Sequence, residues 1–190
     1  ANLINVKVVV CGMYTPEGGD KQFRVNTTFV TVETGETFEV PSFIGVRKQE
    51  DEAARQIAGA FERLAQQTRA MQFCADYAQS EQWDNALTNC DQAIALNPAA
   101  TSARMVRASV LRQTDRLDES LVEYEEVLKI DPMNESALQA AGYVAAQLGQ
   151  DEKARDYYAD YLELDPLNSA VRMRVAYDLA KAGDPSGALV

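Results

Sequence analysis

The tetrapeptide Ala95-Leu-Asn-Pro98 recurs as Lys129-Ile-Asp-Pro132 and as Glu163-Leu-Asp-Pro166, at a constant spacing of 34 residues. A polar turn and an amphipathic segment precede each of the three. Self-similarity at a period of this length is typical of stacked helical pairs, because one pair alone cannot bury its apolar face. The stretch from about residue 67 to residue 182 is therefore expected to determine the architecture.

The period predicts where the helices begin and end. Because proline cannot continue a helix, Pro98, Pro132 and Pro166 should each follow the end of a second helix. The expected pairs are 67–80 with 84–97, 101–114 with 118–131 and 135–148 with 152–165, followed by a last helix at 169–182. Small residues such as Gly142 and Ala154 would let paired helices approach closely.

The small and aromatic residues of the three helical pairs resemble the packing residues of the tetratricopeptide repeat family, over roughly the C-terminal two-thirds of the chain. The first unit matches with Phe73, Cys74, Tyr77, Ala86, Cys90, Ala93 and Pro98, and the third with Leu138, Ala141, Gly142, Ala154, Tyr158 and Pro166. In the second unit Ala108, Tyr124 and Pro132 match, whereas Arg107, Leu111 and Ser120 depart from the usual types. The resemblance implies a mostly α-helical solenoid of three full repeats plus a terminal helix.

Residues 1–46 differ from the rest and predict a small antiparallel β element. A first strand with alternating apolar residues begins near Ile4, and a second is expected at about 22–32, where a change in alternation indicates either a bulge or burial on both faces. A hairpin turn at 33–36 leads to a third, short strand, which Pro41 and Gly45 should end. Three such strands bury too little to be stable alone, so the sheet must lean on the helices or on another chain.

We therefore expect three segments: the β element at 1–46, a connecting helix at 47–66 and the repeat solenoid at 67–190. The connecting helix has acidic residues in its first turn, where the helix dipole favours them, and an apolar stripe at helical spacing. It either continues directly into the first repeat or breaks near Gln66.

Composition narrows the function classes. The chain has a net charge of −11 and no histidine. The negative charge argues against nucleic acid and anionic membranes as partners, because both require a basic face. The absence of histidine removes the commonest general base and metal ligand, and no nucleophile motif, phosphate loop or bilayer-length apolar run is present. We expect no enzymatic activity, no cofactor, no metal and no membrane span.

The family that the chain resembles holds a peptide or helix on the concave wall formed by the first helix of each repeat. Spacing places Met71, Met105, Ser109, Arg112, Gln139, Tyr143, Met173 and Tyr177 on that wall. Co-chaperones of the family clamp a terminal carboxylate there with Lys, Arg and Asn, but Arg112 is the only cation among these positions, which argues against such a clamp. Methionine adapts to varied apolar surfaces and tyrosine anchors interfaces. Alternatively, the solenoid curls tightly and these residues pack against one another.

The last helix should present a polar outer side as a solvating cap. The residues assigned to that side are Arg172, Arg174, Asp178 and Lys181. A cap of this kind would end the array without exposing an apolar helix face.

Two function classes stay open. The first is a non-enzymatic interaction and assembly module whose partner is a protein segment, either a peptide, a helix or a strand. The second is a self-assembling subunit of an extracellular or cell-surface filament, joined head to tail when the first strand extends into a neighbouring copy. The residues of that assembly strand are Ile4, Val6, Val8 and Val10. In the plainer alternative they fold back on Ile57, Phe61 and Leu64 of the same chain.

Cys74 and Cys90 lie midway along the two helices of the first repeat. Packed helices bring facing Cα atoms to roughly 4–6 Å, which overlaps the range of disulfides. A disulfide would favour export to the periplasm or cell surface over a cytoplasmic location, where the pair would be reduced core thiols. Cys11 has no evident partner.

Two segments match the acceptor pattern for N-glycosylation, Asn26-Thr-Thr28 and Asn134-Glu-Ser136. Two matches are close to what chance gives at this content of Asn, Ser and Thr. Asn134 falls in an expected turn between repeats, where an acceptor would be accessible.

Overall fold

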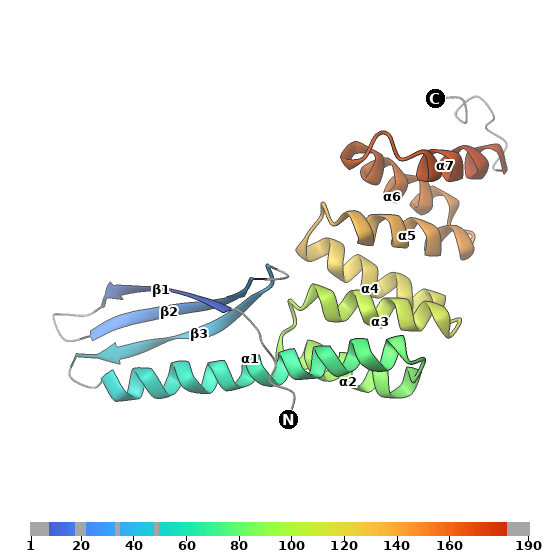
Figure 1. Ribbon diagram of the computed structural model, residues 1–190. Coiled ribbons are helices and arrows are strands. Elements are labelled where there is room, and N and C mark those ends of the chain that lie inside the picture. Colours follow the sequence, from blue (N-terminus) through green and yellow to red (C-terminus); the bar gives the residue numbers. More distant parts are fainter. Residues whose placement is uncertain (1–7, 18–21, 33–34, 48–49, 182–190) are drawn as a thin grey trace. The chain divides into compact units, whose positions relative to one another are not determined.

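The computed structural model describes residues 8–17, 22–32, 35–47 and 50–181. Within these ranges three strands precede seven helices (Figure 1). The strands are β1 (Val8–Pro16), β2 (Gln22–Thr31) and β3 (Thr37–Val46). The helices are α1 (Glu50–Gln79), α2 (Trp83–Leu96), α3 (Thr101–Gln113), α4 (Leu117–Ile130), α5 (Glu135–Gln147), α6 (Asp151–Leu164) and α7 (Ser169–Lys181). The predicted fold class, a mostly helical repeat with a small antiparallel sheet, is confirmed.

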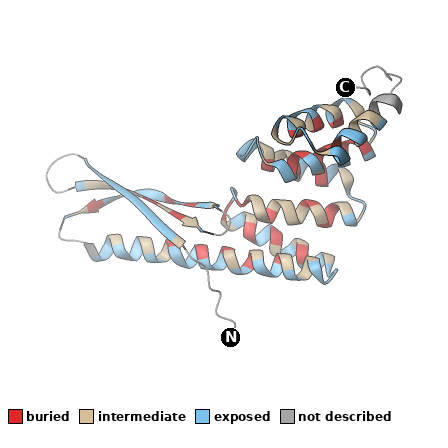
Figure 2. Ribbon diagram, turned by 45° about the horizontal axis from the view of Figure 1, so that its top comes forward, coloured by how far each residue is buried: buried red, intermediate tan, exposed pale blue. Residues whose placement is uncertain are grey.

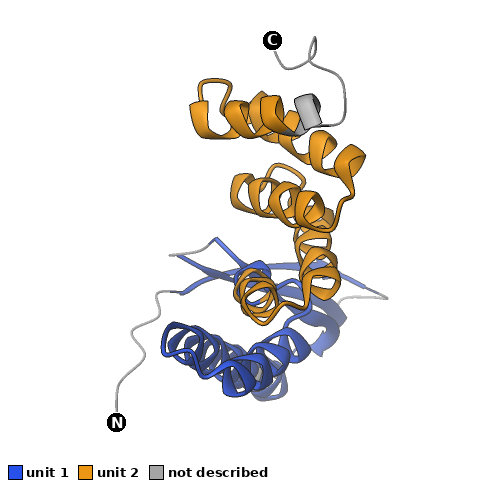
Figure 3. Cartoon of the chain, turned by 90° about the vertical axis from the view of Figure 1, so that its right-hand side faces the viewer, with its two compact units in different colours: residues 1–103 blue, residues 104–190 orange. Residues whose placement is uncertain are grey.

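The chain divides into two compact units, residues 1–103 and residues 104–190, which are described separately below (Figure 3). Unit 1 contains the sheet, α1, α2 and the first residues of α3. Unit 2 contains the rest of α3 and the helices α4 to α7.

The 34-residue period is visible in the backbone of the turns. Within each pair, the turn between the helices contains one residue with positive φ, at Glu81, Asp115 and Gly149. Each second helix ends where a capping amide, of Asn97, Asp131 or Asp165, donates to the carbonyl four residues earlier. The proline that follows each of these caps lies outside the helix, as predicted.

The sheet has the order β1-β2-β3, and its register shifts between Val25 and Thr27, which confirms the predicted bulge. The prediction that Pro41 and Gly45 end a short third strand is wrong, because β3 continues through both to Val46. An edge strand tolerates proline, since one of its two sides makes no ladder hydrogen bonds. Glycine at position 45 has a packing reason: a Cβ there would lie 2.5 Å from the ring of Phe23.

The sheet packs against a helix of its own chain. Phe29, Phe38 and Val40 pack on Ala60 and Leu64 of α1, and Val8 and Ile57 contact the margin of this cluster. The sheet lies along the N-terminal half of α1 (Figure 1). Because α1 is one continuous helix of 30 residues, the expected connecting helix and the first repeat helix are the same element.

Polar contacts tie the β2–β3 hairpin to the turn before α3. The Asn97 amide donates to the Thr37 carbonyl at 3.1 Å. The Glu36 carboxylate accepts hydrogen bonds from the Thr101 hydroxyl, at 3.0 Å, and from the backbone amide of Ser102. The hairpin is therefore held to the repeat by side chains from both partners.

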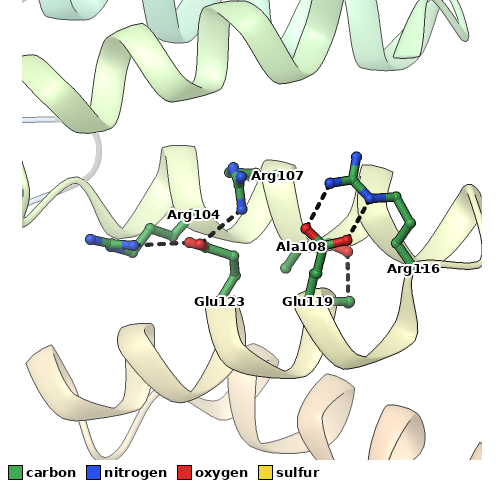
Figure 4. Close-up of polar contacts among 7 residues, drawn as sticks. Arg104, Arg107, Ala108, Arg116, Glu119 and Glu123 are labelled. Atoms are coloured by element: carbon green, nitrogen blue, oxygen red, sulfur yellow. Dashed lines mark hydrogen bonds and ion pairs between the residues drawn. The ribbon is translucent and has the colours of Figure 1, made fainter. Parts of the chain in front are cut away.

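In the second repeat, residues that depart from the family pattern join α3 to α4 (Figure 4). The buried Ser120 hydroxyl donates to the Ala108 carbonyl at 2.7 Å. Arg104 and Arg107 each pair with Glu123 at 2.9 Å, and the Glu123 side chain is only 12% exposed. A carboxylate this buried is stable when two guanidinium groups neutralise it. Of these contacts, those of Ser120 and Arg107 involve residues that depart from the family pattern.

Candidate protein-binding site

Unit 2 contains a cavity of about 420 Å³ between the first helices of its repeats. Residues of α3, α5 and α7 line its sides: Arg112, Gln139, Ala140, Tyr143, Ala170, Val171 and Arg174. The buried rings of Tyr124 and Tyr158, from the second helices α4 and α6, line its inner end. We call this cavity the Arg/Tyr pocket.

Helical spacing explains why these side chains meet. Gln139 and Tyr143 are four residues apart on α5, and Ala170 and Arg174 are four residues apart on α7. Residues at this spacing lie on the same face of a helix, one turn apart. The small alanine side chains leave the space that the cavity occupies.

Two arginines lie over the ring of Tyr143. The guanidinium carbon of Arg112 lies 5.9 Å from the ring centroid, and that of Arg174 lies 5.6 Å from it. Arg174 also lies 6.0 Å from the centroid of Tyr177. All three distances are within the range of cation–π attraction. The Tyr143 hydroxyl accepts a hydrogen bond from Gln147 at 3.4 Å, and 40% of Tyr143 is exposed at the pocket.

Tyr124 supports Arg112 from the inner end of the pocket. Burial raises the pKa of the Tyr124 hydroxyl, and the nearby Arg112 guanidinium partly offsets that increase by its charge and by a hydrogen bond. Tyr124 therefore stays protonated at neutral pH. Arg112 therefore lies near the Tyr124 hydroxyl and 5.9 Å from the centroid of the Tyr143 ring.

The structure brings together some of the predicted wall residues and separates others. Arg112, Gln139 and Tyr143 line the Arg/Tyr pocket, and Tyr177 adjoins it through Arg174. Ser109 is half-buried, and Met173, which is 73% exposed, does not line the pocket. Met105 packs against the core of unit 2, whereas Met71 packs against an alanine cluster in unit 1. Both methionines are half-buried, and their use in partner binding stays a prediction.

Arg174 is the charged pocket residue that sequence reasoning missed. We assigned it to the polar outer side of the last helix, but it lines the pocket and contacts two tyrosine rings. Its position could have been found from spacing, because it lies three residues before Tyr177, a predicted wall position. Arg172 is exposed, as an outer position requires, and the side chains of Asp178 and Lys181 lie outside the described residues.

The edge of the sheet is a second exposed surface. Among the described residues β1 pairs only with β2, and Figure 2 shows it exposed along almost its whole length. Val10 is 55% exposed and Tyr14 is 77% exposed. Of the predicted assembly strand, Val8 packs against the sheet cluster, while Ile4 and Val6 lie outside the described residues.

The remaining candidate residues have defined places. Cys74 and Cys90 form a disulfide with Cα atoms 4.9 Å apart, and Cys11 is exposed on β1.

Asn134 is the N-cap of α5: its side-chain oxygen accepts from the Ala137 amide and its nitrogen donates to Asp131. Asn26 lies in the central strand β2 at the bulge. Glycosylation at either asparagine stays a prediction.

Within the described ranges, no three His, Cys, Asp or Glu side chains gather as they would around a metal ion. Of the helices described, none combines the length and the hydropathy needed to cross a bilayer.

Helical pairs at a 34-residue period, closed by a single last helix, define a tetratricopeptide repeat solenoid. A family model described as "Psidin, N-terminal TPR repeats region" matches residues 57–185. The chain belongs to this family of tetratricopeptide repeat proteins. Such repeats are generally protein–protein interaction modules, and proteins of the family are generally non-enzymatic scaffolds.

Several solved structures share the fold. The first TPR of Spaghetti (RPAP3) bound to the HSP90 peptide SRMEEVD has a TM-score of 0.59 at 15% identity, covering 63% of this chain and 94% of that one. The Arabidopsis OM64 TPR domain has a TM-score of 0.57 at 18% identity, covering 61% and 96%. YrrB, described as a TPR protein with an unusual peptide-binding site, has a TM-score of 0.59 at 22% identity, covering 63% and 62%. No curated protein sequence matches the chain.

Proposed function

We propose that this protein is an interaction and assembly module that binds a segment of a partner protein in the Arg/Tyr pocket. The observation that carries the proposal is the exposed Tyr143 ring with two arginines over it, beside a cavity of about 420 Å³. Tyrosine and arginine dominate the binding energy of many interfaces, and a cavity of this size accommodates a few side chains. The RPAP3 structure contains a bound peptide, and YrrB is described by its peptide-binding site, which supports this use of the fold.

Selection from a phage-displayed library of random 12-residue peptides tests the proposal on the full chain. Peptides selected by the wild type should bind Tyr143→Ala at least about ten-fold more weakly, because the substitution removes the central ring of the pocket. Tyr14→Ala is the matched control, since Tyr14 is more exposed and lies on β1. Peptides that bind Tyr143→Ala as well as the wild type would show that the pocket is not the binding site.

A second candidate function is self-assembly through β1, and its specific support is the chemistry of that strand. No charged residue occurs from Val8 to Pro16, although edge strands are commonly protected by charges. One hydrogen-bonding side of β1 has no strand beside it among the described residues. Pairing with a strand of a second copy would satisfy that side and could continue as an extracellular or cell-surface filament.

Light scattering tests this second candidate. The wild type should gain mass with concentration, and Val10→Lys should stay monomeric because a charge on the edge opposes pairing. Val122→Lys is the control, since Val122 has a similar exposure on α4. A wild-type protein that stays monomeric at high concentration would rule out self-assembly at β1.

A further inference from the structure

We infer that β1 pairs with β1 of a second copy, antiparallel and about a two-fold axis, and that an exposed apolar side of α1 is covered in the same contact. This inference rests on the second candidate function, self-assembly through β1, and specifies which surface of the second copy β1 meets. It does not involve the Arg/Tyr pocket.

α1 covers only part of the sheet. Val10 lies opposite Phe29, and residues opposite each other in an antiparallel pair point to the same face of the sheet. Phe29 is buried against α1 on that face, whereas Val10 is 55% exposed. Further along the same face of β1, Gly12 is exposed and Tyr14 is 77% exposed. The helix-facing side of β1 is therefore an open strip.

The side of α1 that borders this strip is apolar. Four exposed residues spaced by three or four positions share that side, and we call them the α1 flank: Ala54, Ala58, Phe61 and Ala65. The ring of Phe61 is half exposed, and its centroid lies 5.9 Å from that of Phe29 on the central strand. Since α1 lies closest to β3, a side chain that reaches β2 points toward β1. Elsewhere, the exposed surface of this half of the helix carries charges: Glu52, Arg55, Glu62 and Arg63.

A second copy would cover the strand edge and the α1 flank together. Antiparallel strands are related by a two-fold axis perpendicular to the sheet, so both α1 helices would lie on one face of a six-stranded sheet. The two flanks would then border the open strip from both sides. If the nine-residue strands overlap completely, Val10 lies opposite Tyr14 of the second copy and Gly12 lies opposite its own counterpart. Pairs of an aromatic and a β-branched residue stabilise such a ladder.

Charge and area also favour a second copy. Each copy has a net charge of −11, so two copies repel each other least through surfaces without charge. β1 and the α1 flank have no charged residue, and they offer a charged partner nothing to recognise. A strand of nine residues is about 30 Å long, and a sheet with a helix layer is about 20 Å thick, which gives roughly 600 Å² per copy. Twice this area is at the lower end of specific interfaces, so we expect a dimer of moderate affinity.

Cysteine cross-linking tests the register. In a Cys11→Ser background, Gly12→Cys should form a disulfide-linked dimer on oxidation with copper phenanthroline, because opposite positions of paired strands are within disulfide range. Position 12 has room for the side chain, since the nearest atom to an added Cβ is 3.4 Å away. Ser136→Cys in the same background is the exposed control on α5, and should cross-link at least about ten-fold more slowly. Equal cross-linking at the two positions would overturn the inference.

Sedimentation of the full chain tests the α1 flank. The wild type should form a dimer as its concentration rises. Ala58→Glu should weaken dimerisation at least about ten-fold, because the added charge would be buried between the copies. Gln66→Glu is the control, since it adds the same charge at an exposed position of α1 outside the flank, and it should leave dimerisation unchanged. Circular dichroism of each variant shows that its helices are intact.

The outcomes distinguish this inference from the second candidate function. Association that Val10→Lys prevents but Ala58→Glu leaves unchanged would overturn the inference, while self-assembly through β1 would stand. Growth beyond a dimer would do the same, because a two-fold contact between identical strands closes. A wild type that stays monomeric, or association that Val10→Lys leaves unchanged, would overturn both.

Discussion

In the first repeat the disulfide between Cys74 and Cys90 joins α1 to α2, whereas the equivalent positions of the third repeat carry Gly142 and Tyr158. Each pair of positions is related to the other by two periods of the repeat. The Cα atoms of the disulfide are 4.9 Å apart, and a Cβ added at Gly142 would lie 2.5 Å from the Tyr158 ring. The same place in the repeat therefore requires a very close approach of two helices. A covalent bond secures it in one pair, and a glycine beneath an aromatic ring allows it in the other.

The largest effect should come from removing the covalent bond. We expect Cys74→Ser with Cys90→Ser to lower the free energy of unfolding by about 3 kcal/mol, because the disulfide closes a loop whose ends are 16 residues apart. Urea denaturation measures the loss, and hydrogen exchange should locate it in α1 and α2. A reductant should destabilise the wild type equally and leave the variant unchanged. Two alkylatable thiols at these positions in protein isolated from its native location would contradict an oxidised pair.

The third repeat should be sensitive to added volume. We expect Gly142→Ala to lower stability by about 1–2 kcal/mol, since displacing the buried Tyr158 ring outweighs the gain in helix propensity. Gly59→Ala on α1 is the matched control, because a Cβ there meets nothing within 4 Å. The control should gain about 0.5–1 kcal/mol. A gain in both variants would show that Tyr158 moves aside easily.

The second repeat adds a polar contact that the other two lack. Ser120 stands where the neighbouring repeats have Ala86 and Ala154, and its buried hydroxyl donates to the Ala108 carbonyl. Ser120→Ala should therefore lower the free energy of unfolding by about 1 kcal/mol, the usual net contribution of a hydrogen bond. Thermal or urea unfolding measures it, with the exposed Ser136→Ala as control. An unchanged stability would mean that packing alone holds α3 to α4.

The smallest effect should come from the turns. Asp115 and Gly149 occupy the same place in successive repeats, both with positive φ. We expect Asp115→Gly to raise stability by about 0.5 kcal/mol, because glycine adopts this conformation without the steric penalty of a side chain. The reverse exchange, Gly149→Asp, should lower stability by a similar amount or more. Chemical denaturation of the two variants side by side checks the opposite signs.

Much of the helical architecture could be predicted from local sequence. The prolines at 98, 132 and 166 and the small and aromatic residues between them determined where the helices lie, because helix ends and close packing need specific residue types. The bulge in β2 was likewise visible as a change in alternation. By contrast, the length of β3 was misjudged, since Pro41 is tolerated only because β3 is an edge strand, and strand order is a property of the sheet.

Tertiary structure alone decided which side chains share the pocket. Helical spacing placed Met105 and Tyr143 on the same wall, but Met105 packs against the core and the Tyr143 ring contacts two arginines. Arg174 looked like part of a solvated cap, and it joined the pocket because α7 sits beside α5 in unit 2. The hydrogen bond from the Thr101 hydroxyl to the Glu36 carboxylate also depends on tertiary structure, because the two residues are 65 positions apart in the sequence. A repeat period specifies local helix geometry, whereas the neighbours of a side chain depend on contacts between elements distant in sequence.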